Sequence, residues 1–89
     1  MDGGAFDAGP RRQVRVSDLD LAGYLLCEGA RLVRVVRTPE PGRLDFVLEA
    51  PEETFMRATR AFMAGDARVE PRRFAQSRRA LQRALRANQ

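Results

Sequence analysis

The chain has 89 residues, of which 44% are hydrophobic, so it is long enough for one globular domain but too short for a core that also encloses a deep cavity. Its formal net charge is +4, its basic residues are all arginine, and it has no histidine and one cysteine. This composition excludes an internal disulfide and a cysteine or histidine metal cluster, and it indicates no cofactor. With no secretory leader and no apolar run near ~20 residues, we expect a cytoplasmic protein without a membrane partner.

The first segment, residues 1–12, contains three glycines and a proline, and we expect it to be a disordered leader. A single α+β domain is expected at residues 13–89. Residues 13–16 have the alternation of a short edge strand, with Val14 and Val16 facing the same way. The folded part of the chain is therefore expected to begin with this strand.

The next segment predicts an apolar helix. Ser17 offers an N-cap hydroxyl, and Asp20 a carboxylate three residues later, which is a variant of the capping box. The helix is expected to run to about Glu28 and to end at Gly29, where glycine supplies the left-handed conformation. More than half of its circumference is apolar, so we expect it to be the central core helix, lying across the strands that follow.

Residues 32–49 predict two strands joined by a tight turn, and the other segments are expected to cover this hairpin. Leu44, Phe46 and Leu48 alternate with charged residues, which is the pattern of a strand with one buried face. Residues 39–42 hold two prolines and a glycine, so neither strand can continue through the turn. An isolated hairpin is marginally stable in water, and it therefore needs a partner layer.

Two registers of this hairpin are open. The first places Val35 opposite Phe46 and Val33 opposite Leu48, with Arg34 on the outer face. The alternative, shifted by one residue, places Arg34 opposite Phe46 on the buried face. We prefer the first register, because burying an unpaired guanidinium is costly. It leaves three apolar residues on the second face of the hairpin, which form a candidate surface for self-association: Leu32, Val36 and Val47.

A second helix is predicted after the hairpin. Pro51 and the two acidic residues that follow it suit the first turn of a helix, where the missing proline donor has no partner and acids favour the dipole. Gly65 is expected to end this helix. We interpret four of its side chains as core rather than as a cofactor site: Phe55, Met56, Phe62 and Met63.

The C-terminal third carries the basic character, since residues 67–89 hold seven arginines and one glutamate. Residues 67–69 are a candidate short strand, and Glu70 with Pro71 opens a last helix that is expected to reach about Arg86. At 3.6 residues per turn, one side of this helix is a narrow apolar stripe and the opposite side holds four arginines within about 60°. The stripe consists of Phe74, Leu81 and Leu85, and the arginines are Arg72, Arg79, Arg83 and Arg86.

The predicted order of elements is (β)αββα(β)α, which is an α+β fold. If both short strands form, the first six elements match the ferredoxin-like βαββαβ order, with a sheet of three to four strands and one appended helix. If neither forms, the domain is an antiparallel hairpin covered by three helices. Both arrangements stay open.

Between Val16 and Leu85, several positions follow a pattern of helix caps, core residues and helix stops. They are Ser17-Asp18-Leu19, Ala22, Leu25-Leu26, Gly29, Phe46-Val47-Leu48, Phe62, Gly65 and Val69-Glu70-Pro71-Arg72. With these residues the chain resembles a small bacterial family of single-domain proteins known only as a domain of unknown function. The resemblance implies a bacterial protein and brings no activity, cofactor or partner with it. The last helix of that family often carries Lys after its Leu, where this chain has Gln82-Arg83.

Catalysis is not expected from these residues. The hydroxyl and thiol candidates, Ser17, Ser77 and Cys27, have no histidine to activate them. Asp18 and Asp20 are two positions apart on a helix, so their side chains point about 200° apart and cannot act as an acid and base pair.

Two kinds of binding are expected instead. The four arginines of the last helix suit nucleic acid, because guanidinium forks engage phosphates, although a solvated helix face in an arginine-rich chain has the same pattern. The second hairpin face and an open strand edge suit a protein partner or a homodimer. We therefore expect a small non-catalytic binding or adaptor module that acts through protein surfaces, with nucleic-acid binding as the alternative.

Overall fold

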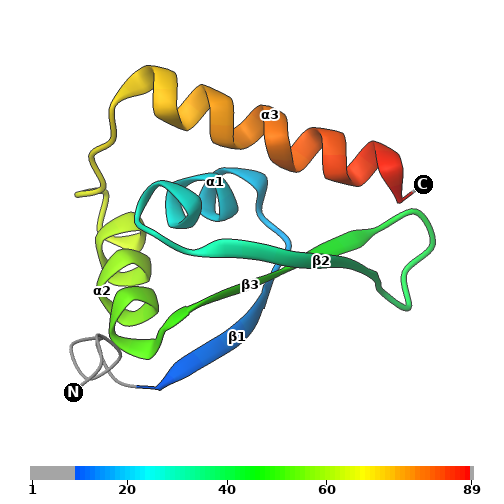
Figure 1. Cartoon of the computed structure of the whole chain (residues 1–89), viewed down its shortest axis with the longest axis horizontal. Coiled ribbons are helices and arrows are strands. Elements are labelled where there is room, and N and C mark those ends of the chain that lie inside the picture. The colour runs from blue at the N-terminus through cyan, green and yellow to red at the C-terminus, as the bar shows by residue number, and fades with distance from the viewer. Residues whose placement is uncertain (1–9, 89) are drawn as a thin grey trace, which may run out of the picture.

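The computed structural model describes residues 10–88 of the chain. It contains an antiparallel three-stranded sheet and three helices, which confirms the predicted α+β fold (Figure 1). The strand order is β1-β3-β2. The elements are, along the chain, β1 (Arg11–Val16), α1 (Leu19–Cys27), β2 (Arg31–Arg37), β3 (Leu44–Pro51), α2 (Glu52–Met63) and α3 (Pro71–Ala87).

The first strand forms and begins earlier than expected. β1 starts at Arg11, so Arg11 and Arg12 belong to the sheet and not to the leader, of which residues 1–9 lie outside the described part. The Pro10 carbonyl accepts a hydrogen bond from the Glu52 amide at 3.2 Å, which extends the ladder between β1 and β3 by one more pair. Pairing with β3 thus orders a polar segment whose own sequence resembles a loop.

The second candidate strand does not form. Residues 67–69 connect α2 to α3 in an irregular conformation, and Ala67 and Val69 pack their side chains against the core. Gly65, with φ of 79°, follows the end of α2 and Glu70 caps α3, so residues 66–69 alone connect the two helices. The order βαββαα therefore contains the first five elements of the ferredoxin-like arrangement, and a second long helix replaces its last strand.

The cap of α1 also differs from the prediction. The carboxylate of Asp18, and not the hydroxyl of Ser17, accepts hydrogen bonds from the amides of Asp20 (2.8 Å) and Leu21 (3.0 Å). Asp18 Oδ1 can reach both amides from the position directly before the helix, so Asp18 is the N-cap. Gly29, with φ of 110°, follows the helix as predicted.

The hairpin register is partly as predicted. Val35 lies opposite Phe46 and Arg34 opposite Val47, but Leu32, not Val33, lies opposite Leu48. An irregularity between Leu32 and Arg34 makes Val33 an extra residue in β2, as in a β-bulge. The bulge turns Leu32 to the core face, where it packs against the buried cluster, so its assignment to the second face was wrong.

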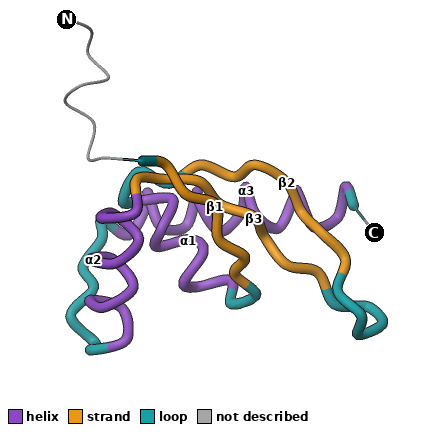
Figure 2. Tube along the Cα trace, turned by 90° about the horizontal axis from the view of Figure 1, so that it is seen from below, coloured by secondary structure: helices purple, strands orange, loops and turns teal. Residues whose placement is uncertain are grey.

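All three helices lie on the same side of the sheet (Figure 2). α1 contacts β1, α2 and α3, so it is the element through which the layers meet (Figure 1). The most deeply buried large side chains come from α1, β3 and α3, and they confirm that α1 is a core helix: Leu25, Phe46, Leu48 and Leu81. The other face of the sheet has no helix over it among residues 10–88.

α1 and α3 approach closely at Gly23, which is buried. A Cβ atom at this position would lie 3.3 Å from the Phe74 ring and 3.2 Å from Cγ of Arg78, both on α3. These distances are shorter than ordinary van der Waals contacts. Glycine therefore allows the two helices to pack at this separation.

We expect Gly23→Val to lower the free energy of unfolding by about 1–3 kcal/mol, as overpacking does in other cores. Valine has a better helix propensity than glycine, so a loss of stability must come from the contact with α3. Urea denaturation of the two proteins measures the effect. Equal or greater stability of the valine variant would show that α1 and α3 are not in close contact here.

We also expect Asp18→Ala to cost about 0.5–2 kcal/mol, because two amides of the first turn lose their acceptor. Ser17→Ala should change stability by less than about 0.5 kcal/mol, since Ser17 is exposed and does not cap the helix. Thermal denaturation of the two variants side by side tests the assignment. The reverse order of effects would restore Ser17 as the cap.

Candidate functional site

The four arginines predicted as a site form one exposed face of α3, which we call the α3 arginine face: Arg72, Arg79, Arg83 and Arg86. Glu70 caps the helix, since its carboxylate accepts hydrogen bonds from the amides of Arg72 (3.1 Å) and Arg73 (3.0 Å). Phe74, Leu81 and Leu85 pack against the core on the opposite side. The predicted division of α3 into an apolar stripe and an arginine face is thus present in the structure.

The α3 arginine face is not neutralised within the chain. Among residues 10–88, no carboxylate lies within 4.0 Å of any of its four guanidinium groups. α3 contains six arginines and no acidic residue. Half of the arginines of the sheet and of α2 have a carboxylate within reach, in the pairs Arg12–Glu52, Arg15–Asp45, Arg31–Glu49 and Arg57–Glu28, and Arg43 in the turn before β3 pairs with Glu40.

The other two arginines of α3 hold the helix in place. Arg73 donates a hydrogen bond to the Cys27 carbonyl at the end of α1 (2.9 Å), and Arg78 pairs with Asp20 at the start of α1 (3.0 Å). Both contacts bridge α3 and α1 from opposite ends of α1. Arg73 and Arg78 are therefore structural, and the available positive charge of α3 lies on its outer face.

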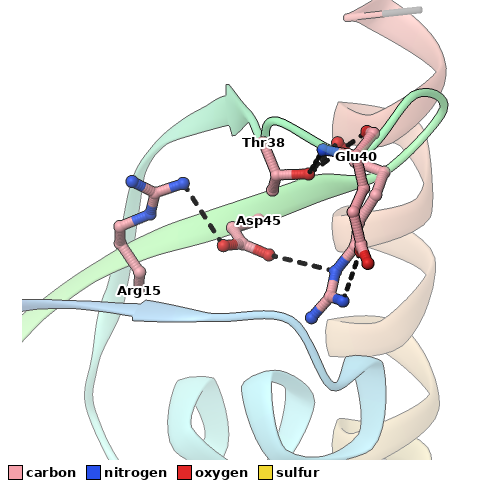
Figure 3. Close-up of polar contacts among 5 residues, drawn as sticks. Arg15, Thr38, Glu40 and Asp45 are labelled. Carbon is pink, nitrogen blue, oxygen red and sulfur yellow. Dashed lines mark hydrogen bonds and ion pairs between the residues drawn. The ribbon is translucent and has the colours of Figure 1, made fainter.

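The uncovered face of the sheet carries a ladder of ion pairs. The Asp45 carboxylate on β3 lies between Arg15 of β1, at 3.3 Å, and Arg43, whose Nε is 4.0 Å away (Figure 3). Further along β3, Glu49 lies 2.7 Å from Arg31 of β2. The side chains of Asp45 and Glu49 are only 16% and 18% exposed, so their partners largely cover them. Both carboxylates of this face are therefore paired with arginines, while Arg34 on the same face has no carboxylate within 4.0 Å among residues 10–88.

The surface predicted for self-association is not a continuous apolar patch. Val47 is on the uncovered face, as expected, but it is only 3% exposed and lies between Arg15 and Arg34 on the neighbouring strands. Val36 is half-buried on the same face, and Leu32 is on the core face. Self-association remains a prediction, but these three residues do not form one surface for it.

Two methionines predicted as core are exposed, which corrects the interpretation of α2. Met56 is 54% and Met63 is 73% exposed, whereas Phe55 is buried. At 3.6 residues per turn, Met56, Met63 and Arg60 fall within about 60° of one another, so the helical pattern already placed the methionines on the polar side. That spacing would have identified Met56 as a surface residue. The structure adds that Met56 lies beside β1, where it lines a groove with Val14.

The remaining reactive groups are few. Cys27 Sγ lies 3.6 Å from Ser77 Oγ, where α1 and α3 pack together. Within residues 10–88, no cluster of three or more His, Cys, Asp or Glu side chains has the arrangement of a metal site. None of the helices in this part of the chain is long and apolar enough to cross a membrane.

Comparison of the chain with protein-family models, with curated proteins and with solved structures finds no match.

Tyr24 is a buried titratable residue in the core between α1 and α2. Its ring lies 6.1 Å from that of Phe62. Burial raises the pKa of the Tyr24 phenol, the nearby Glu28 carboxylate adds to the increase, and Arg57 opposes it. The folded protein therefore keeps this proton at a pH at which the unfolded chain has lost it.

Because the pKa of Tyr24 is higher in the folded than in the unfolded state, the free energy of unfolding should fall as the pH rises through about 10. We expect Tyr24→Phe to show a shallower fall over the same range, since it has no proton to lose. Urea denaturation at a series of pH values measures both slopes. Parallel slopes would mean that the phenol titrates normally in the folded protein.

Proposed function

We propose that this protein is a small non-catalytic binding module, an adaptor, and that the α3 arginine face is its contact with an anionic partner. The observation that supports the proposal is the concentration of four exposed guanidinium groups on one helix face without carboxylates in reach among residues 10–88. A cytoplasmic location is part of the proposal, since a single free cysteine suits a reducing compartment.

The uncompensated charge has an energetic consequence. Arg79 and Arg83 are four residues apart, and Arg83 and Arg86 three, so neighbouring guanidinium groups repel one another along the helix by about 0.2–0.5 kcal/mol per pair. A bound polyanion removes this repulsion. The face is therefore better suited to a ligand with several negative charges than to a single carboxylate.

Two classes of partner have such a charge array: an acidic protein surface, which is the expected partner of an adaptor, and the phosphate backbone of nucleic acid. The length of the α3 arginine face is suited to several phosphates of a duplex, so nucleic acid is the partner to test directly. From Arg72 to Arg86 the helix rises about 21 Å, and duplex DNA carries roughly twelve phosphate charges over the same length. Arginine forks can bind phosphates in bidentate fashion.

For the nucleic-acid alternative, we expect the protein to bind a random-sequence duplex with a log–log salt slope that includes about −3.6 from four phosphate contacts. These four contacts alone should lower the affinity about 100-fold when the salt concentration is raised from 50 to 200 mM. The variant with all four arginines replaced by glutamine should lose it and remain folded, because these side chains are exposed. Fluorescence anisotropy with a labelled duplex measures the slopes.

A variant with the same change in net charge serves as the control. Arg11, Arg34, Arg37 and Arg60 are exposed, are not on α3, and have no carboxylate within 4.0 Å among the described residues. Replacing these four by glutamine should preserve most of the slope. Equal losses in the two variants would mean that net charge, and not the α3 face, causes binding. No binding of duplex or single strand at low salt would leave the acidic protein surface as the partner.

A further inference from the structure

The outer edge of β1 presents backbone groups that have no strand beside them among residues 10–88, because β1 pairs only with β3. Residues of an antiparallel ladder alternate between bonded and non-bonded pairs. The Pro10 carbonyl bonds to the Glu52 amide, so the even-numbered residues of β1 are the bonded ones in the observed register. The N–H and C=O groups that point away from β3 therefore belong to Arg11, Gln13 and Arg15.

A shallow groove lies beside this edge, on the core side of the sheet. It is lined by Arg12, Val14, Phe55, Met56, Thr59 and Arg60, from β1 and α2. Met56 is 54% exposed there, although the residue before it is buried. Side chains alternate across a sheet, so every second residue of a strand added to β1 would lie over this groove.

The charge of the edge and groove is positive. β1 contains three arginines and no acid, and Arg60 adds a fourth from α2. Arg12 and Arg15 pair with Glu52 and Asp45 at 3.3 Å, but their side chains remain 56% and 55% exposed and can face an added strand. Arg11 and Arg60 have no carboxylate within 4.0 Å in the described part of the chain. An acidic strand complements this surface.

A second copy of the chain fits the edge less well. In a two-fold antiparallel pairing of β1 with itself, the register that uses all three edge-facing residues is centred on Gln13. It places Arg11 of each copy directly opposite Arg15 of the other, and like charges directly opposite one another are destabilising. The same charges favour a partner strand that carries carboxylates at those two positions.

We propose that the β1 edge, together with the groove between β1 and α2, binds an extended acidic–apolar segment of a partner protein, which adds to the sheet as a fourth strand next to β1. Main-chain hydrogen bonds to Arg11, Gln13 and Arg15 would hold the segment. The acidic side chains of the partner segment would lie opposite Arg11 and Arg15 on the uncovered face of the sheet. Its apolar side chains, which alternate with them, would lie against Val14 and Met56. This surface is separate from the α3 arginine face.

The peptide Glu-Leu-Thr-Val-Glu with Gly-Ser flanks has the required alternation and serves as the probe. Its two carboxylates fall opposite Arg15 and Arg11 in the antiparallel register, and Leu and Val face the groove. Arg-Leu-Thr-Val-Arg, with the same flanks, is the charge-reversed control. We expect the acidic probe to bind, as measured by fluorescence anisotropy at 150 mM salt, and to slow hydrogen exchange of the three edge amides.

Two variants with matched controls locate the binding. Met56→Glu places a negative charge in the groove and should weaken binding of the acidic probe by about 10-fold or more, while Met63→Glu, on the same helix but outside the groove lining, should change it by less than about 3-fold. Gln13→Pro removes one edge donor without removing a bond to β3, and should also weaken binding by about 10-fold or more, since proline is tolerated at a strand edge. Gln13→Thr keeps the donor and should bind as wild type does.

Several results would overturn the proposal. They are absence of probe binding, equal binding of the arginine peptide, equal effects of Met56→Glu and Met63→Glu, or unchanged hydrogen exchange at the edge amides in the saturated complex. If, without peptide, protection of these amides from hydrogen exchange rises with protein concentration, the edge is bound by a second copy of the chain. If the edge amides are protected at every protein concentration and lose this protection when residues 2–9 are deleted, the edge is bound by the chain's own N-terminal segment.

Discussion

The packing of α1 against the sheet on one side and against α3 on the other is the interaction on which the rest of the structure depends. α1 has nine residues, which is too short to be stable as an isolated helix, so its stability comes from burial. Ala22 and Leu25 are almost fully buried, and Gly23 allows α3 to approach. Two polar contacts, from Arg73 to the end of α1 and from Arg78 to its start, fix α3 along it.

This packing places every helix on one side of the sheet, and it thereby decides which surfaces face solvent. β3 is the central strand and is paired on both sides, whereas β1 and β2 each have one side without a strand among residues 10–88. The charged ladder on the uncovered face pairs Asp45 with Arg15 of β1 and Glu49 with Arg31 of β2. A face covered by charged side chains can remain in water, so a sheet with helices on one side only is a consistent arrangement.

The distribution of acidic residues explains where positive charge remains. Asp20 of α1 binds Arg78, and Glu28, the C-cap of α1, binds Arg57, so these two acids serve contacts between helices. Glu70 is committed to the cap of α3. Of the arginines without a carboxylate within 4.0 Å among residues 10–88, four lie on the outer face of α3 and two, Arg11 and Arg60, lie next to the β1 edge. These two surfaces come from different elements.

Much of this architecture follows from local patterns in the sequence. Period-two alternation in residues 44–48 predicts β3, the glycines at positions 29 and 65 mark the ends of α1 and α2, and 3.6-residue spacing separates the apolar stripe of α3 from its arginine face. These features depend on the backbone geometry of single elements, so neighbouring residues are sufficient to encode them. The same reasoning, applied to α2, would also have placed Met56 beside Arg60 on the exposed side.

Other features were decided only when the elements packed together. Pairing with β3 draws Arg11 and Arg12 into a strand, and the bulge at Val33 turns Leu32 into the core, because the register that buries most apolar surface is a property of two strands together. Residues 67–69 do not become a strand, since Pro71–Ala87 is held against α1. The edge of β1 has no strand beside it among residues 10–88, and the groove next to it is formed by β1 and α2 together, so no single segment of the sequence contains this information.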